Sequence, residues 1–392
     1  MIGFARTERG AQRHAALCGE VAAFIRRGDR DDAEREFERL ALAVFAYQFE
    51  TIAPYHRLCR GLGRTPDTVS SWRAIPAIPA QAYKQHRLFA GAPDAIVRTF
   101  RSSGTTEPGR TSQSHFSRPG LAVMDAAIAA SAASRVFSDG RATRILVLTP
   151  PPDQAPHMVM AHGMSQLVAA FGAAGSRFVG GASTVDFAAL RAELEAAQRD
   201  GTAVSLLGPS FGFVHFFDYL AASGRRLALP PGSRLLDAGG YKGKSREISR
   251  DAFVAWAAQS LGLPTARVIN LLGMTELASQ VYDRVAPGGM RMKLPPHWMR
   301  TSIVDPRRFG PDGPEPVHGG DVGLLRHVDL ASIERPMAIQ SEDIGRYVGP
   351  AVPAETGQRG FEILGRAKGA EPRGCSLTAE DVAGDGEGEV AA

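Results

Sequence analysis

The sequence predicts an α/β fold, in which helices cover a mainly parallel sheet and a β-rich part follows. Two observations predict it. From about residue 140 to 275, short β-branched or Leu-rich runs alternate with helical stretches, which is typical of βαβ units. From about residue 280 the chain is richer in Gly, Pro and short apolar runs. The strands expected are 144–149, 177–179, 203–207, 234–237 and 267–272, and the helices between them include 185–199 and 248–261.

The first hundred residues are predicted to be mainly helical. Apolar residues recur at helical spacing within 37–45. The segment Ile75-Pro76-Ala77-Ile78-Pro79 is an exception, because each proline restricts the preceding residue to extended geometry. We therefore expect a helical region over 1–100 that packs on the core, an α/β core over 101–280, and a β-rich subdomain over 281–392 that ends in a short polar tail.

Composition excludes several classes of protein. Apolar residues make up 44% of the 392 residues and charged residues 22%, as in ordinary globular proteins. The net charge of +4 does not favour nucleic acid as a partner. No run approaches the roughly 18 apolar residues of a membrane span, and no signal-peptide core is present. Three scattered cysteines suit a reducing cytoplasm and are too few for a zinc site.

The densest local signal is a run of hydroxyl and glycine residues near position 103. It reads Arg101-Ser102-Ser103-Gly104-Thr105-Thr106-Glu107-Pro108-Gly109-Arg110-Thr111. Glycines let a backbone approach a ligand and present successive N–H groups to an anion, and hydroxyls add donors for phosphate oxygens. The run is not a Walker loop, because no Gly-Lys-Ser/Thr ends it. The alternative is a flexible surface loop.

A second signal follows the last predicted parallel strand, where ligands of such sheets bind. The segment is Asn270-Leu271-Leu272-Gly273-Met274-Thr275-Glu276-Leu277. A carboxylate beside a hydroxyl is a reasonable Mg²⁺ ligand when phosphates supply the other oxygens. The alternative is a helix start, with Thr275 as N-cap and Glu276 in the first turn.

Three further segments could contact a nucleotide. Asp237-Ala238-Gly239-Gly240-Tyr241-Lys242-Gly243 could let a flat ring lie against the backbone, and the alternative is a tight turn. In Gln340-Ser341-Glu342-Asp343-Ile344-Gly345-Arg346 an acidic residue before glycine could bind ribose hydroxyls, and the alternative is a polar hairpin turn. The segment from Phe361 to Cys375 is a hydrophobic strand that runs into a basic, Gly-rich turn, and the alternative is a surface turn.

The order and spacing of these motifs resemble the motif series of the adenylate-forming superfamily, over roughly residues 75 to 376. Within it, the chain is most similar to the acyl-protein synthetase family of bacterial bioluminescence. Two segments carry that closer resemblance: 75–79 followed by Tyr83-Lys84, and 101–106 leading to Ser114-His115. The resemblance implies the large-domain fold of adenylate-forming enzymes. Few residues follow Arg366, so we expect the small C-terminal domain of typical members to be absent.

The resemblance also implies roles. It assigns ATP phosphates to Ser102, Ser103, Gly104, Thr105 and Thr106, adenine to Gly239, Gly240 and Tyr241, the α-phosphate to the segment Gly273-Met274-Thr275, Mg²⁺ to Glu276, and ribose to Asp343 with Arg366 nearby. Lys84 and His115 are candidate catalytic residues, His115 beside the acyl pocket, although a packed histidine is the alternative. Cys375 stands where the family's acyl-accepting cysteine lies.

The implied activity is ATP-dependent conversion of a fatty or aryl acid to its acyl-adenylate, with transfer to a thiol. The thiol is Cys375 or belongs to a partner, an acyl-reductase or a carrier protein. Two other readings stay open: a stand-alone adenylating enzyme of secondary metabolism, and a non-catalytic nucleotide-binding scaffold. All three are cytoplasmic proteins without a membrane span.

Overall fold

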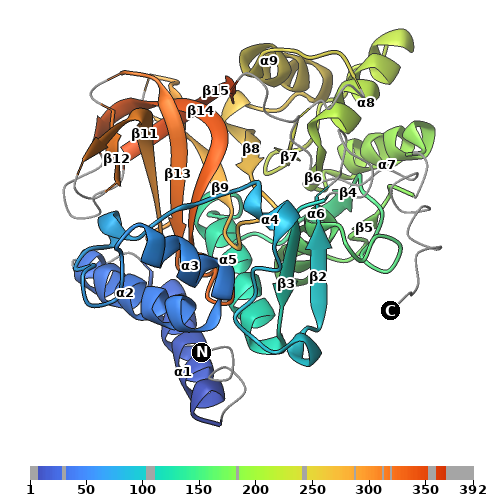
Figure 1. Cartoon of the computed structure of the whole chain (residues 1–392). Coiled ribbons are helices and arrows are strands. Elements are labelled where there is room, and N and C mark those ends of the chain that lie inside the picture. The colour runs from blue at the N-terminus through green and yellow to red at the C-terminus, as the bar shows by residue number, and fades with distance from the viewer. Residues whose placement is uncertain are drawn as a thin grey trace. The chain divides into compact units, whose positions relative to one another are not determined.

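A computed structural model of the chain describes residues 8–28, 32–102, 111–181, 185–240, 245–286, 288–310, 313–317, 320–351 and 359–367. The chain divides into two compact units (Figure 1). Unit 1 comprises Met1–Ser131 and Thr275–Glu371, and unit 2 comprises Ala132–Met274 and Pro372–Ala392. Among the described residues, no helix is both long enough and apolar enough to cross a membrane.

Unit 2 contains the predicted parallel sheet. Its strands are β4 (Arg144–Val147), β5 (Arg177–Phe178), β6 (Val204–Pro209), β7 (Arg234–Ala238) and β8 (Val268–Leu272). They lie in the order β5-β4-β6-β7-β8, and each neighbouring pair is parallel. The helices are α6 (Val159–Phe171), α7 (Phe187–Asp200), α8 (Ser210–Ala222) and α9 (Arg250–Leu261), with a 3₁₀ turn at Thr265–Arg267. All five predicted strands and both predicted helices are confirmed.

The packing of unit 2 follows from its hydrophobic pattern. Strands β6 and β7 are buried along their whole length, as expected for strands covered on both faces. Residues of α7, α8 and α9 share one core cluster with residues of β4, β6, β7 and β8. Helix α7 begins where Asp186 accepts a hydrogen bond from the N–H of Ala189 (2.9 Å) and ends at Gly201, whose positive φ of 70° closes the helix.

Unit 1 contains an antiparallel sheet and the N-terminal helices. The strands run in the order β12 (Gly313–Pro316), β11 (Met299–Gly310), β13 (Gly323–Asp329), β14 (Ala338–Ala351), β15 (Arg359–Arg366), β10 (Arg291–Lys293) and β9 (Val281–Val285). A separate hairpin is formed by β2 (Arg98–Arg101) and β3 (Gln113–Phe116). The helices are α1 (Glu8–Arg27), α2 (Ala33–Thr51), α3 (Ala53–Gly61), α4 (Ala82–Gln85) and α5 (Arg118–Arg135), with 3₁₀ turns at Trp72–Ala74 and Pro93–Ala95.

The proline-rich segment 75–79 is extended, as predicted. Its last two residues form β1 (Ile78–Pro79), which pairs in parallel with β14. The N–H of Ala80 then donates to the carbonyl of Gln340 (3.0 Å). Helices α1 to α3 lie at one end of strands β11, β13 and β14, as Figure 1 shows in blue and orange. The β-rich later part is thus confirmed, and helices α1 to α4 lie within the first hundred residues.

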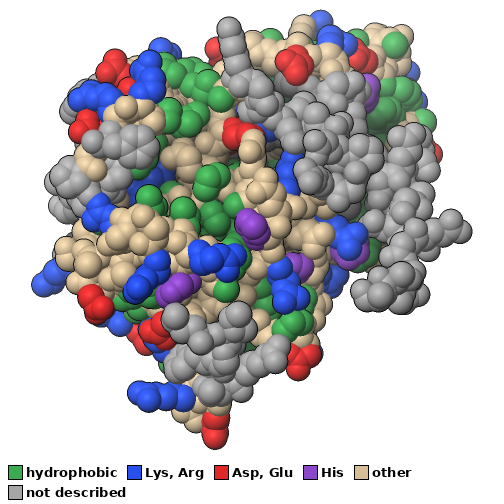
Figure 2. Space-filling model, in the orientation of Figure 1, with side chains coloured by type: hydrophobic (Ala, Val, Ile, Leu, Met, Phe, Trp, Pro, Cys, Tyr) green, Lys and Arg blue, Asp and Glu red, His purple; other side chains and the backbone are tan. Residues whose placement is uncertain are grey.

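The charged surface is mixed. On the face drawn in Figure 2, Lys and Arg side chains are interspersed with Asp and Glu rather than gathered in one block. This distribution agrees with the small net charge of +4.

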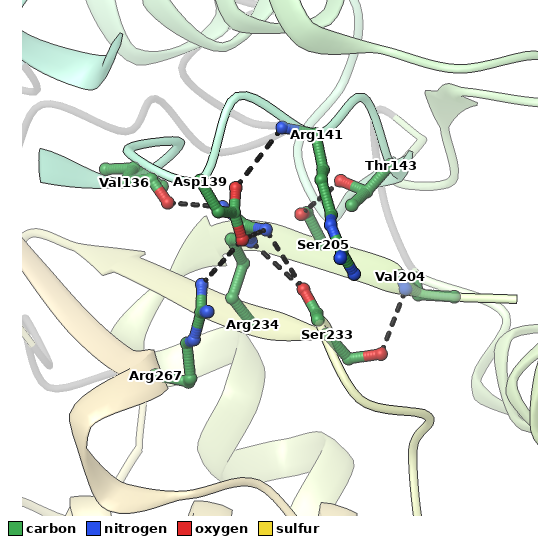
Figure 3. A network of polar contacts seen from close by, with 10 residues as sticks. Val136, Asp139, Arg141, Thr143, Val204, Ser205, Ser233, Arg234 and Arg267 are labelled. Atoms are coloured by element: carbon green, nitrogen blue, oxygen red, sulfur yellow. Dashed lines mark hydrogen bonds and ion pairs between the residues drawn. The ribbon is translucent and has the colours of Figure 1, made fainter. Parts of the chain in front are cut away.

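A buried arginine stabilises unit 2 at the start of β7. The side chain of Arg234 is 0% exposed. Its Nη2 donates to Asp139 Oδ2 (2.9 Å) and to the carbonyl of Gly232 (3.0 Å), and its Nη1 donates to the carbonyl of Val136 (Figure 3). Burial alone would raise the pKa of Asp139, but the hydrogen bonds from Arg234, Arg267 and the N–H of Arg141, together with the charge of Arg234, outweigh burial and lower that pKa. Arg234 Nε also donates to the carbonyl of Gly232 (3.3 Å), so each nitrogen of this guanidinium has an acceptor.

We predict that Arg234→Met lowers the free energy of unfolding of unit 2 by about 3 kcal/mol, because it leaves buried acceptors without their donor. Urea denaturation measures the change. Arg267→Met is the control: Arg267 also contacts Asp139 (3.1 Å) but its side chain is 35% exposed, so its loss should cost under about 1 kcal/mol. Equal effects of the two variants would contradict the prediction.

Candidate functional site

The Ser/Thr/Gly run is presented by the β2–β3 hairpin. Ser102 and Ser112 are bonded directly after the last strand pair of this hairpin. The N–H of Ser102 donates to the carbonyl of Ser112, and the N–H of Ser112 donates to Ser102 Oγ, both at 2.9 Å. The hairpin is anchored by Phe100 and Phe116, which are buried and meet edge to face at 5.5 Å. Ser103, Gly104, Thr105 and Thr106 lie outside the described residues. The described flanks therefore form a rigid base for the predicted phosphate loop.

His115 lies on β3 and is 8% exposed. Its Nδ1 is 2.9 Å from Thr99 Oγ1 on the opposite strand. Burial lowers the pKa of His115, and repulsion from Arg87, Arg335 and Arg101 lowers it further. The imidazole is therefore neutral at pH 7, and its surroundings are positively charged.

Lys84 lies on the short helix α4. The preceding residue, Tyr83, is buried, and its hydroxyl donates to the carbonyl of Pro336 (3.2 Å). Burial raises the pKa of Tyr83 well above its ordinary value, so this hydroxyl remains protonated and keeps its hydrogen bond. The helix that carries Lys84 is thereby attached to the segment before β14.

Thr275 and Glu276 form a turn, so the alternative of a helix start is wrong. The turn is held by Asp329, a fully buried carboxylate at the end of β13. Asp329 Oδ2 accepts hydrogen bonds from the N–H groups of Ala278 and Ser279, both at 2.9 Å, and Oδ1 accepts one from Ser279 Oγ (2.6 Å). Hydrogen bonds from backbone N–H groups to a carboxylate are strong. The position of Glu276 is therefore set through the backbone two and three residues after it, which Asp329 binds.

The segment that joins β13 to β14, residues 330–337, is buried, which is unusual for a connection because its backbone polar groups cannot reach water. Gln48 of α2 supplies partners for four of them. Its Nε2 donates to the carbonyls of Ser332 (2.7 Å), Ile333 (3.1 Å) and Arg335 (2.6 Å), and its Oε1 accepts from the N–H of Met337 (3.0 Å). This one amide fixes the conformation of the segment.

Glu334 and Arg335 lie in the middle of this buried connection. Glu334 accepts hydrogen bonds from the N–H (2.9 Å) and the hydroxyl of Ser117, and its Oε1 is 3.0 Å from His14 Nε2. Burial alone would raise the pKa of Glu334, but His14 and Ser117 outweigh burial and lower it. Arg335 stacks on the ring of Phe116 and donates from Nε to the carbonyl of Glu276 (3.4 Å).

Asp343 and Arg366, both predicted to lie near ribose, are neighbours on paired strands. Asp343 on β14 is directly opposite Arg366 on β15, and Arg366 Nε is 3.7 Å from Asp343 Oδ1. Arg366 also forms an ion pair with Glu342. Because Asp343 lies inside β14, the alternative of a polar hairpin turn is wrong.

The paired glycines belong to unit 2 and follow β7. Gly239 has a φ of +77°, a conformation that favours glycine, and Gly240 has open space where a side chain would be. Asp237 positions this turn: its carboxylate accepts hydrogen bonds from Ser210 Oγ (2.8 Å), Asn270 Nδ2 (2.8 Å) and Arg250 Nη1 (2.6 Å). Three segments at the carboxyl ends of neighbouring strands are therefore joined through one buried carboxylate.

The structure thus brings together only some of the predicted residues. In unit 1, the turn that carries Thr275 and Glu276 contacts the segment that also contacts β3, on which His115 lies. Gly273 and Met274 belong to unit 2 with the paired glycines. Tyr241 and Cys375 lie outside the described residues. The positioning groups Gln48, Asp329 and Arg335 were not predicted, because a single polar residue in an apolar run gives no motif.

Two comparisons of the sequence connect this arrangement to known proteins. The family model described as acyl-protein synthetase, LuxE, matches residues 28–382. A long-chain-fatty-acid–luciferin-component ligase of Vibrio harveyi is 21% identical over 347 residues, which covers 87% of this chain and 86% of the relative. The ligase of the same name from Aliivibrio fischeri is 20% identical over 349 residues, with 88% of each covered. The resemblance carried by the motif series is confirmed.

Solved structures agree on the fold. An open form of 2-hydroxyisobutyryl-CoA ligase in complex with 2-HIB-AMP and CoA superimposes with a TM-score of 0.63 at 15% identity, over 86% of this chain and 77% of that one. An acyl acid amido synthetase does so with a TM-score of 0.52 at 11% identity, over 89% and 70%. At such identities the likeness is one of fold, and it confirms the predicted large-domain fold of adenylate-forming enzymes.

We predict that Gln48→Leu lowers the free energy of unfolding of unit 1 by about 3 kcal/mol or more, because three carbonyls and one N–H of the buried connection lose their partner at once. Guanidinium denaturation measures it. Gln81→Leu is the control. Gln81 is exposed, and its described side-chain hydrogen bond is the one that it donates to Glu342. A Gln48→Leu protein as stable as Gln81→Leu would contradict the assignment.

Proposed function

Because the chain belongs to the acyl-protein synthetase family, we propose that it activates a carboxylic acid with ATP as an acyl-adenylate and passes the acyl group to a thiol. The observation that carries this proposal is the family match over residues 28–382, which includes every motif from Ser102 to Cys375. The two curated relatives are named for long-chain fatty acids, so a long-chain fatty acid is the acid class that we propose here.

The reaction has two balanced steps. A carboxylate oxygen of the acid attacks the α-phosphorus of ATP, the bond from that phosphorus to the β-bridging oxygen breaks, and pyrophosphate leaves. A thiolate then attacks the acyl carbon of the mixed anhydride, and AMP leaves with the electron pair of the broken carbon–oxygen bond. Neither step needs a covalent nucleophile before the thiol, so catalysis depends on stabilising charge around the phosphates.

The chain's own residues would supply that stabilisation. The hydroxyl and N–H groups of the loop that begins at Ser102 would bind the phosphates of ATP, and Asp343 with Arg366 would bind the ribose. The paired glycines after β7 would lie against adenine. His115, which burial and nearby arginines keep neutral, would border the acyl group. Lys84 would provide a further positive charge.

Thr275 and Glu276 offer a hydroxyl and a carboxylate, the hard oxygen donors that Mg²⁺ prefers. Glu276 is 8% exposed, and in the described part of the chain no group of three acidic, His or Cys side chains could hold a metal alone. This donor set suits an ion whose other ligands are phosphate oxygens. When bound, Mg²⁺ would neutralise charge on the departing pyrophosphate.

The other readings differ in what they would do with ATP. A stand-alone adenylating enzyme would activate an acid without an acyl-protein stage, and a scaffold would bind nucleotide without turnover. An acyl-reductase or a carrier protein is the partner that we propose for the acyl group.

We predict Mg²⁺-dependent exchange of labelled pyrophosphate into ATP, stimulated by a carboxylic acid and most by a long-chain fatty acid. Glu276→Gln should abolish exchange while the protein keeps its fold, because the side chain keeps its shape but loses the charge that binds the metal. A panel of fatty, aryl and short-chain acids measures the preference. ATP binding without exchange on any acid would favour the scaffold, and an active Glu276→Gln protein that melts lower would make Glu276 a structural residue.

We predict that incubation with ATP and the preferred acid places an acyl thioester on Cys375. Neighbouring Lys368 and Arg373 would favour the thiolate, the reactive form of cysteine. The thioester should be visible as a mass shift of the C-terminal peptide and labile to hydroxylamine. Cys375→Ser should keep pyrophosphate exchange and lose the stable acyl-protein, whereas Cys59→Ser should lose neither. Acyl transfer to a partner at the wild-type rate by Cys375→Ser would show direct transfer from the adenylate instead.

A further inference from the structure

Unit 1 contains two buried arginines that stack on phenylalanine rings but differ in their partners. Arg300 is 3% exposed and lies 4.0 Å from the centre of the Phe37 ring. Both of its Nη atoms donate, Nη1 to the carbonyl of His297 (2.8 Å) and Nη2 to Glu34 Oε2 (2.6 Å). Arg300 therefore forms a structural ion pair with Glu34, and both of its terminal nitrogens have a hydrogen-bond acceptor.

Arg335 is buried to the same degree, at 1% exposed, and lies 3.9 Å from the centre of the Phe116 ring. Its Nε makes one long hydrogen bond, to the carbonyl of Glu276 (3.4 Å). Its Nη2 is buried and has no hydrogen-bond partner among the described residues. An unpaired buried charge is costly to the folded state, so a chain that keeps one has a use for it.

None of the three carboxylates near Arg335 pairs with it among the described residues. Asp329, Glu334 and Glu276 act on Arg335 through space, yet within the described ranges none of them forms an ion pair with it. Asp329 accepts hydrogen bonds from the N–H groups of the turn at 278–279. Glu334 accepts hydrogen bonds from Ser117 and lies against His14. The guanidinium therefore has a free donor and no local carboxylate to accept it.

Arg335 contacts the turn after β8, to which the sequence assigns phosphate and Mg²⁺ contacts, and the strand that follows the predicted phosphate loop. Through Phe116 it adjoins the strand that follows the Ser/Thr/Gly loop, and through the carbonyl of Glu276 it adjoins the turn with Thr275. The hydroxyl of Thr275 is 1% exposed and, in the described part of the chain, likewise lacks a hydrogen-bond partner. Arg335 and the adjoining turn therefore each hold a buried donor that an anionic oxygen would satisfy.

We propose that Arg335 binds an anionic oxygen of the substrates, either a phosphoryl oxygen of the nucleotide or a carboxylate oxygen of the acid. The inference rests on the proposed function, since it names a binding residue for that reaction. Its guanidinium is already oriented by Phe116 and by the Glu276 carbonyl, so a ligand oxygen would gain a charge-assisted hydrogen bond without ordering a flexible side chain.

The experiment compares Arg335→Met with the matched variant Arg300→Met. Without ligand, Arg335→Met should melt at or above the wild-type temperature, because an apolar side chain of similar length replaces an unpaired charge. Arg300→Met should melt lower, because it leaves Glu34 and a carbonyl unpaired. Calorimetric titration with AMP and Mg²⁺, and separately with tetradecanoate, should show one ligand bound roughly tenfold to a hundredfold more weakly by Arg335→Met. Weaker AMP binding identifies a phosphoryl oxygen, and weaker tetradecanoate binding a carboxylate oxygen.

Arg335→Lys keeps the inference testable if the methionine variant unfolds easily. Lysine retains the charge, so this variant should recover part of the lost affinity. Two results overturn the role of Arg335 while the proposed function stands: wild-type affinity for both ligands in Arg335→Met, or a loss that Arg335→Lys does not recover at all. A wild-type chain that binds neither AMP nor tetradecanoate and exchanges no pyrophosphate overturns the proposed function, and the role of Arg335 with it.

Discussion

The architecture of unit 1 depends on satisfying the backbone of a buried connection. Residues 330–337 join two strands through the interior, where each unpaired N–H or carbonyl would cost free energy. Three side chains help to meet that demand: Gln48 and Tyr83 from distant parts of the chain, and Asp329 directly before the connection. The same groups set the site, because Asp329 also holds the turn with Glu276, and Tyr83 adjoins Lys84. Fold and site therefore share one hydrogen-bond network.

Much of the fold could be predicted from the sequence, because hydrophobic periodicity reports burial directly. The five parallel strands of unit 2 and its helices α7 and α9 follow from alternating apolar runs, and the extended segment before β1 follows from its prolines. That unit 1 is formed by two separate segments of the chain could not be predicted. Hydrophobic periodicity indicates the local secondary structure and does not indicate which distant segments pack together. The contact between Gln48 and the connection spans 284 residues along the chain.

The candidate site, like the fold, could be predicted from the sequence only in part. The motif residues that we propose for the site, such as Thr275, Glu276 and the pair of Asp343 with Arg366, could be predicted from spacing and order. Gln48, Asp237 and Arg335 could not, because what marks them is burial together with the number of satisfied partners. Two arginines in similar surroundings illustrate the point. Arg300 and Arg335 are both buried against phenylalanine, and only their hydrogen bonds separate a structural cation from one that we propose binds ligand.

The large separation in sequence between Gln48 and its partners has a consequence for biosynthesis. Helix α2 leaves the ribosome early, whereas the connection that it must bind is made some 284 residues later. Unit 2, apart from its last residues, is continuous in sequence and is synthesised entirely between the two segments of unit 1. Its local contacts can form before any of the strands β9 to β15 of the antiparallel sheet of unit 1 has been made. During that interval the apolar side chains of α1 and α2 have no partner from the later strands. Chaperones that shield nascent apolar helices would therefore act on the first sixty residues rather than on the parallel sheet.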